Sequence, residues 1–218
     1  TTLVFNTPLT IKHFETIYEL SKDKTFIYGG RENKANPLFT SGTVGMHFES
    51  IGGYGNFKST AKFDFGVARL PYYPEVKDAP QNTIIGGASL WVFNGKPKAD
   101  YKGVAKFFTF LSQPESQAYW HQTTGYVPIT MDGIAHVSGT GYYIKNPGAD
   151  IPVRQLTLTE PTKNSMGLRL GNMPEIRVII QEEMEKAFQG QQTAKAALDS
   201  AVKRGNVVLR NCERTNKT

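Results

Sequence analysis

Histidine serves proteins as a metal ligand and as a general acid or base, and this chain has four, at His13, His47, His121 and His136. No two of them form an H-x-x-H or H-E-x-x-H pair, so their spacing does not support a metal site. The sequence also lacks a G-x-S-x-G nucleophile elbow and a G-x-x-x-x-G-K-[ST] phosphate loop. We therefore expect a protein that is not an enzyme and that binds no metal.

An acidic run holds Glu182, Glu183 and Glu185. These carboxylates fall in a predicted helix whose other face is apolar, which is typical of a solvated surface. We expect them to face solvent rather than to form a paired-carboxylate site. The lone Cys212 excludes an internal disulfide and a zinc site built from cysteines, and we expect it to be incidental.

The composition is that of an ordinary globular chain, with 39% hydrophobic and 20% charged residues among 218, enough for one large domain or two small lobes. The formal net charge is +6, but the basic residues are scattered, so nucleic-acid binding is not expected. No apolar run is long enough to span a membrane, and no signal peptide is visible. Because the chain starts at Thr1 rather than Met, we expect a cut inside a longer protein.

Five helices are expected. Thr7 followed by Pro8 is a favourable start, because threonine caps a helix and proline suits its first position. Apolar residues at helical spacing continue from there and recur in four further segments. The predicted helices begin at 7–8, cover 99–111, run from Pro114 to Gly125, run from Pro174 to Gly190, and follow the cap Thr193.

Three segments are typical of β-strands. Residues 44–48 alternate in polarity, residues 65–68 form a short apolar run, and residues 83–93 are apolar on both sides of two glycines, as a buried strand is. Trp91 and Trp120 fall in apolar patterns, so we assign both to the core. Strands that alternate with helices indicate an α/β fold, although residues 140–172 show no clear pattern.

Three landmarks carry a resemblance to a known family: FTSGTVGM at 39–46, IIGGASL at 84–90 ahead of a predicted helix, and the turn GYVP at 125–128. Their order and spacing resemble the family 1 extracellular solute-binding proteins. The resemblance implies a type II periplasmic-binding-protein fold, which is α/β with two lobes and a hinge, here incomplete at the N-terminus. It places residues 1–86 and 166–218 in the C-terminal lobe and residues 87–165 in the N-terminal lobe.

Within this family, residues 113–128, 167–177 and 196–202 are most similar to the members that serve enterobacterial importers of glycerol 3-phosphate. The resemblance implies the C-terminal half of the substrate-binding component of an ABC importer for sn-glycerol 3-phosphate and glycerophosphodiesters. It also implies a periplasmic location, membrane permease subunits as partners, a monomer when full length, and no cofactor. The implied ligand contacts are Ser50, Gly87, Tyr126 and Arg177.

The chemistry of Arg177 agrees with such a ligand. A phosphate ester favours an arginine, hydroxyl donors and backbone N–H groups over a metal. Arg177 stands in the first turn of the helix that Pro174 opens, where the N–H groups and the helix dipole also favour an anion. The alternative is a surface ion pair with Glu175 or Glu182.

The other three implied contacts have structural alternatives as well. Gly87 lets a ligand oxygen approach its backbone, or it serves close strand packing. Tyr126 donates a rigid hydroxyl to the ligand, or it is a buried core tyrosine. Ser50 donates to a phosphate, or it caps the helix that follows it.

Other functions stay open. The chain can belong to a binding protein for a different solute, such as a sugar, or to an interaction module that stands alone. An enzyme of the glycoside hydrolase type would need two facing carboxylates, which this sequence does not obviously supply. By the resemblance, the opposite wall of the site lies outside this chain, so we expect the isolated chain to bind poorly.

Overall fold

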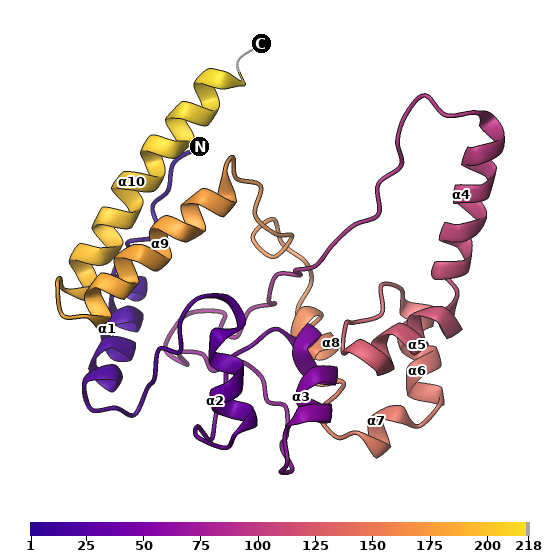
Figure 1. Ribbon diagram of the computed structural model, residues 1–218, viewed down its shortest axis with the longest axis horizontal. Coiled ribbons are helices and arrows are strands. Elements are labelled where there is room, and N and C mark those ends of the chain that lie inside the picture. Colours follow the sequence, from indigo (N-terminus) through magenta and orange to yellow (C-terminus); the bar gives the residue numbers. More distant parts are fainter. Residues whose placement is uncertain (217–218) are drawn as a thin grey trace. The chain divides into compact units, whose positions relative to one another are not determined.

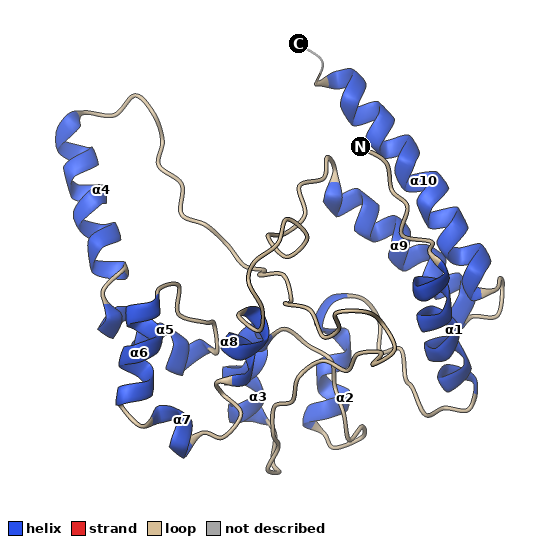
Figure 2. Cartoon of the chain, turned by 180° about the vertical axis from the view of Figure 1, so that it is seen from behind, coloured by secondary structure: helices blue, strands red, loops and turns tan. Residues whose placement is uncertain are grey.

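The computed structural model describes residues 1–216 of the chain. Contacts between residues divide the chain into two compact units. Unit 1 consists of Thr1–Pro37 and the segment from Leu168 to the C-terminus, and unit 2 consists of Leu38–Gly167. Within the described residues, the regular structure is helical and no β-strand forms (Figure 2). The predicted lobe boundaries at 86 and 166 stay a prediction.

Unit 1 is built on α1 (Pro8–Lys22), α9 (Met173–Phe188) and α10 (Ala194–Thr215), with the short 3-10 helix η1 (Glu32–Ala35). Helices α9 and α10 pack side by side (Figure 1). Their apolar faces supply most of the buried core of this unit, which contains Phe14, Ile176, Ile179, Ala187, Ala194, Ala197, Leu198, Ala201, Val208 and Leu209. The small alanines of α10 allow the neighbouring helices to approach closely.

Two of these helices begin with the caps that the sequence predicts. The side-chain oxygen of Thr7 accepts a hydrogen bond from Thr10 N–H at 3.2 Å, and that of Thr193 accepts one from Ala196 N–H at 3.1 Å. Each bond satisfies an N–H group that has no partner within the helix. All five predicted helices are confirmed, with shifts of one or two residues at some ends.

The N-terminal segment is held against α10. Leu3 N–H donates to the side-chain oxygen of Asn206 at 2.8 Å, and the amide of Asn206 donates back to the Leu3 carbonyl at 3.1 Å. Gly205 allows this approach, because a Cβ there would lie 2.5 Å from a methyl carbon of Leu3. Unit 1 is therefore closed by contacts between the two ends of the sequence.

Unit 2 contains the remaining helices, with α2 (Asn36–Thr40) at its boundary. They are η2 (Ile51–Gly53), α3 (Tyr54–Thr60), α4 (Lys98–Leu111), α5 (Pro114–Thr124), α6 (Met131–Gly139), α7 (Tyr142–Lys145) and α8 (Ile151–Leu156).

The buried amide of Gln117 joins α5 to the turn before α6. Its oxygen accepts from Ile129 N–H at 2.8 Å and from Thr130 N–H at 3.1 Å, and its nitrogen donates to the Ser112 carbonyl at 2.8 Å.

The predicted strands at 44–48, 65–68 and 83–93 are wrong for the described residues, where these segments are irregular. A strand exists only as part of a hydrogen-bonded ladder with a neighbour. The polarity pattern indicates which face of an extended segment would be buried, but it does not show whether a second segment lies beside it to pair with. Within residues 1–216, no segment takes that place.

The assignment of Trp91 and Trp120 to the core is also wrong, because their exposed fractions are 89% and 59%. An apolar side chain is buried only where a second surface covers it, and the described residues provide none here. Residues 1–216 contain no helix that is both long and apolar enough to cross a membrane.

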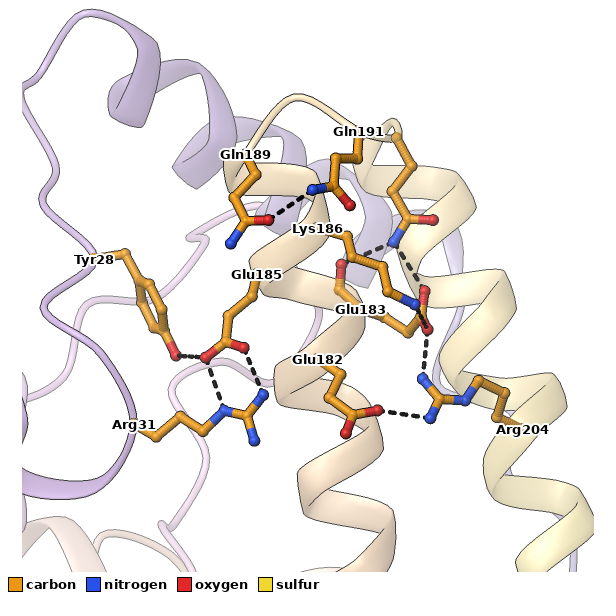
Figure 3. A network of polar contacts seen from close by, with 10 residues as sticks. Tyr28, Arg31, Glu182, Glu183, Glu185, Lys186, Gln189, Gln191 and Arg204 are labelled. Atoms are coloured by element: carbon orange, nitrogen blue, oxygen red, sulfur yellow. Dashed lines mark hydrogen bonds and ion pairs between the residues drawn. The ribbon is translucent and has the colours of Figure 1, made fainter.

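The acidic run is not the solvated face that its pattern indicates. Glu183 is only 2% exposed, and its carboxylate accepts hydrogen bonds from Lys186 at 2.7 Å, Gln192 at 2.9 Å and Arg204 at 2.5 Å (Figure 3). Arg204 also pairs with Glu182 at 2.6 Å. Burial alone would raise the pKa of Glu183, but these donors outweigh it and lower the pKa to about 2. The run therefore joins α9 to α10.

Glu185, on another side of α9, extends these interactions toward the first part of the chain. Its carboxylate accepts two hydrogen bonds from Arg31, at 2.8 and 2.5 Å, and a third from the hydroxyl of Tyr28 at 2.8 Å. The bond from Arg31 is the main reason why the pKa of Glu185 falls to about 2. Burial and the adjacent carboxylate raise the pKa of Tyr28 to about 12.

We expect unit 1 to lose stability as the pH falls from about 4.5 toward about 2. Both glutamates have a pKa in the folded state below their ordinary value, so their contribution is complete above the unfolded pKa and disappears as the folded groups take up protons. Urea unfolding followed by circular dichroism at each pH measures this loss.

Two variants sharpen the acid titration. Glu183→Gln should reduce the pH dependence in this window to the part that Glu185 contributes, because the buried group can no longer titrate. Glu175→Gln, which changes an exposed carboxylate of the same helix, should leave the pH dependence as it is. Constant stability of the unmodified chain across the window would contradict the prediction.

Candidate ligand-binding site

Three of the four implied ligand contacts lie together in unit 2. The ring of Tyr126 is the centre of the group: a Cβ on Gly52 would lie 2.9 Å from it, and one on Gly87 would lie 3.7 Å from it. Ser50 is linked to the same Gly52, whose N–H donates to the serine hydroxyl oxygen at 3.3 Å. The structure thus brings Ser50, Gly87 and Tyr126 together on the surface, while ligand binding by them stays a prediction.

This grouping depends on a backbone-to-backbone contact between residues 51–55 and residues 123–126. A Cβ on Gly55 would lie 2.5 Å from the carbonyl oxygen of Thr123, and one on Gly125 would lie 2.5 Å from the carbonyl oxygen of Ile51. Side chains larger than glycine would force the two segments apart. Gly125 also has a φ of 88°, which glycine adopts readily and other residues rarely do.

Ser50 combines its two predicted roles. Its hydroxyl oxygen accepts the Gly52 N–H at the start of η2, so the helix-capping alternative is realised. A hydroxyl both accepts and donates, and capping uses only its acceptor. The O–H proton of Ser50 therefore remains available to a ligand oxygen.

Gly87 and Tyr126 are both open to solvent. Gly87 has a φ of 141°, and within the described residues its N–H donates to no other group. The closest atom to a Cβ there is Cε1 of Tyr126, at ordinary contact distance, so close strand packing does not explain this glycine. Tyr126 is 45% exposed, and the alternative of a buried core tyrosine is therefore wrong.

Arg177 is the fifth residue of α9, which starts at Met173, so its side chain rather than its N–H would reach an anion. It is exposed. Within the described residues no ion pair joins it to Glu175 or Glu182, and Glu182 pairs with Arg204. Arg177 belongs to unit 1 and the other three residues to unit 2, and its place in a common site stays a prediction.

One further side chain contacts this region, and it was not among the predicted site residues. His121, in the last turn of α5, is 2% exposed, and its Nδ1 lies 2.7 Å from the carbonyl oxygen of Tyr126. The sequence does contain a signal for this contact: Gly125 ends the helix four residues after His121, so the chain turns back toward it. The described residues hold no group of three or more histidine, cysteine or acidic side chains that could bind a metal ion.

Residues 4–142 match the family model described as bacterial extracellular solute-binding protein. Three curated relatives are each named sn-glycerol-3-phosphate-binding periplasmic protein UgpB. The protein of Escherichia coli strain K12 is 48% identical over 216 residues, that of Yersinia enterocolitica 47% over 215, and that of Pectobacterium atrosepticum 46% over 217. The matches cover at least 99% of this chain and 49% of each relative, so the chain spans about half the length of the curated relatives it matches.

Two solved structures are similar in fold. UgpB from Mycobacterium tuberculosis in complex with glycerophosphocholine has a TM-score of 0.75 and is matched over 96% of this chain and 51% of its own. The cyclic alpha-maltosyl-1,6-maltose binding protein from Arthrobacter globiformis has a TM-score of 0.73, over 96% and 50%. Each is 24% identical to this chain, so the likeness shows the fold alone. It confirms the predicted type of fold, while the two-lobe arrangement stays a prediction.

We expect Gly55→Ala to destabilise the chain by about 1–3 kcal/mol, because the new methyl group would collide with the Thr123 carbonyl and separate the two segments. The matched control is Gly103→Ala in α4, where an added Cβ meets nothing within 4 Å. That change should be neutral or stabilising by up to about 1 kcal/mol. Urea unfolding measures both, and equal effects of the two substitutions would show that the contact does not matter.

Proposed function

The chain belongs to the bacterial extracellular solute-binding proteins, and from this premise we propose that it forms part of the substrate-binding component of an ABC importer. The protein captures sn-glycerol 3-phosphate and glycerophosphodiesters in the periplasm and delivers them to the membrane permease. The proposal is carried by the 46–48% identity, over nearly the whole chain, to relatives named for sn-glycerol 3-phosphate. Its action is binding and transport rather than catalysis.

The chemistry of the grouped residues supports a phosphate ester. Ser50, Gly87 and Tyr126 offer an aliphatic hydroxyl, a backbone N–H and a phenolic hydroxyl, and all three are exposed close to one another. Such donors suit the several acceptor oxygens of a phosphate. Arg177 adds a permanent positive charge in the proposed site, where it offsets the charge of the ligand.

Transport requires that the ligand change the conformation of the protein. In the proposed arrangement, residues 1–86 and 166–218 form one lobe, and residues 87–165 contribute to the other. A ligand that contacts both lobes has a higher affinity for the closed form, and this difference in affinity shifts the population toward closure. The closed form is then the one that docks on the permease.

An exposed apolar surface in unit 2 supports the proposal that the other half of the relatives' length completes the lobe to which residues 87–165 contribute. It comprises Leu90, Trp91, Phe93, Phe107 and Phe110, each more than half exposed. Between residues 92–94 and α4 lies an open groove of about 480 Å³, lined mostly by apolar side chains. Apolar patches of this kind are normally covered by another protein surface. We therefore propose that the half not spanned by this chain covers it.

A sugar is the competing solute. The fold of the cyclic alpha-maltosyl-1,6-maltose binding protein is nearly as similar as that of the glycerophosphocholine complex. Both structures are equally distant in sequence, however, so they do not discriminate between solutes. The closer relatives, and the group of donors around Tyr126, favour the phosphate ester.

We expect the full-length protein, meaning this chain together with the half that the relatives have in addition, to bind sn-glycerol 3-phosphate and glycerophosphocholine but not maltose. Calorimetric titration and a rise in melting temperature measure the binding. Stabilisation by maltose alone would overturn the phosphate assignment. The isolated chain should bind weakly, and micromolar binding by it would contradict the view that the site is incomplete.

Arg177→Gln in the full-length protein should weaken binding of sn-glycerol 3-phosphate by about 10- to 100-fold, as expected for the loss of a hydrogen bond between charged groups. The matched control is Arg69→Gln, which removes the same charge from an exposed position outside the group and should leave the affinity unchanged. Equal losses in the two variants would assign the effect to net charge.

Trp91→Ala should have a small effect on the stability of the isolated chain and a large effect on that of the full-length protein. In the isolated chain, where this side chain is 89% exposed, the free energy of unfolding should change by less than about 0.5 kcal/mol. In the full-length protein the same change should cost about 3–5 kcal/mol if the other half buries the indole. Urea unfolding of both forms measures it, and a small effect in both would refute the proposed covering.

A further inference from the structure

The tautomer of His121 follows from its hydrogen bond. A carbonyl oxygen only accepts, so the Nδ1 atom that lies 2.7 Å from the Tyr126 carbonyl oxygen must carry a proton. Burial lowers the pKa of His121, and the bond to Tyr126 raises it by less. The ring is therefore neutral at pH 7, with Nδ1 as donor and Nε2 as a bare acceptor.

The same ring has no second hydrogen bond in the described residues. Its Nε2 is buried without a partner, as is the hydroxyl of Tyr143. The rings of Tyr142 and Tyr143 pack edge-on against the imidazole, with centroids 5.6 and 5.7 Å away. Packing fixes the plane of the imidazole, and among residues 1–216 its one hydrogen-bond partner is the backbone carbonyl of Tyr126.

That contact completes the anchoring of the turn that carries Tyr126. Gly125 N–H donates to the His121 carbonyl at 2.8 Å, and Tyr126 N–H donates to the hydroxyl of Thr124 at 3.1 Å. Both bonds hold the chain on the N-terminal side of Tyr126. The imidazole holds its carbonyl group, so the peptide planes on both sides of this residue are fixed.

We propose that His121 is a positioning residue for ligand binding, which holds the Tyr126 backbone so that the phenol stays between Gly52 and Gly87, next to Ser50. The inference rests on the proposed function, in which Tyr126 contacts the ligand. His121 itself is buried behind the turn and does not touch the ligand. It acts by limiting the conformations of Tyr126 before the ligand arrives, which lowers the entropic cost of binding.

Two substitutions in the full-length protein test the geometry. In His121→Asn the side-chain amide can place a donor where Nδ1–H stands, whereas in His121→Gln the donor lies one bond farther out. We expect calorimetry with sn-glycerol 3-phosphate to show about a tenfold loss of affinity for His121→Gln and less than about a threefold loss for His121→Asn. Equal losses in both variants, in step with equal drops in melting temperature, would assign His121 a structural role only.

A double-mutant cycle tests whether His121 affects ligand affinity through Tyr126. In a Tyr126→Ala background, His121→Gln should cause no further loss of affinity, because there is no phenol left to position. Additive losses would overturn the proposal. If the unmodified protein binds neither sn-glycerol 3-phosphate nor glycerophosphocholine, the proposed function fails, and this inference fails with it.

A measurement without substitutions guards against variants that do not fold. Nitrogen-15 NMR of the unmodified protein distinguishes the two neutral tautomers of histidine. The Nδ1–H tautomer of His121 is expected near pH 7, and the Nε2–H tautomer would overturn the proposal.

Discussion

The contact between residues 51–55 and residues 123–126 is the constraint on which the candidate site depends. Two backbones approach there so closely that Gly55 and Gly125 have no room for a Cβ. Within the sequence Gly52-Gly53-Tyr54-Gly55, the first and last glycines have a steric role, because a Cβ there would collide with Tyr126 or with Thr123. They let a helix N-terminus meet a helix C-terminus, and both ends bring polar groups to the same surface. The donors at Ser50 and Tyr126 therefore become neighbours although they are far apart in the sequence.

The helices were predictable because their signals are local. A cap, a proline and a periodic apolar face all lie within the segment that folds, as at Thr7 and Thr193. The strands predicted at 44–48, 65–68 and 83–93 were wrong, because a strand needs a second segment to pair with. The polarity pattern of one segment does not show whether such a partner exists. The prediction that the acidic run faces solvent was wrong for the same reason, because it too depends on a segment far away in the sequence. Arg204, one of the groups that lower the pKa of Glu183, lies on another helix. The periodicity of α9 contains no information about it.

The site divides in a similar way. The resemblance to a family supplied Ser50, Gly87, Tyr126 and Arg177, and the structure groups the first three. Periodicity and composition alone would not have chosen them, because each residue has a common structural role. His121 was missed, since a histidine near a helix end has many possible partners. Only the left-handed turn at Gly125 selects the carbonyl of Tyr126 as the acceptor.

The irregular segment 83–93 bears on how the protein can be made. It combines aromatic side chains such as Trp91 and Phe93 with backbone groups that pair with no strand in the described residues. Exposed segments of this composition readily add strands from other molecules. The order of synthesis therefore matters: a covering surface that is already folded would bury the segment as it emerges, whereas one that arrives later would leave it open to aggregation.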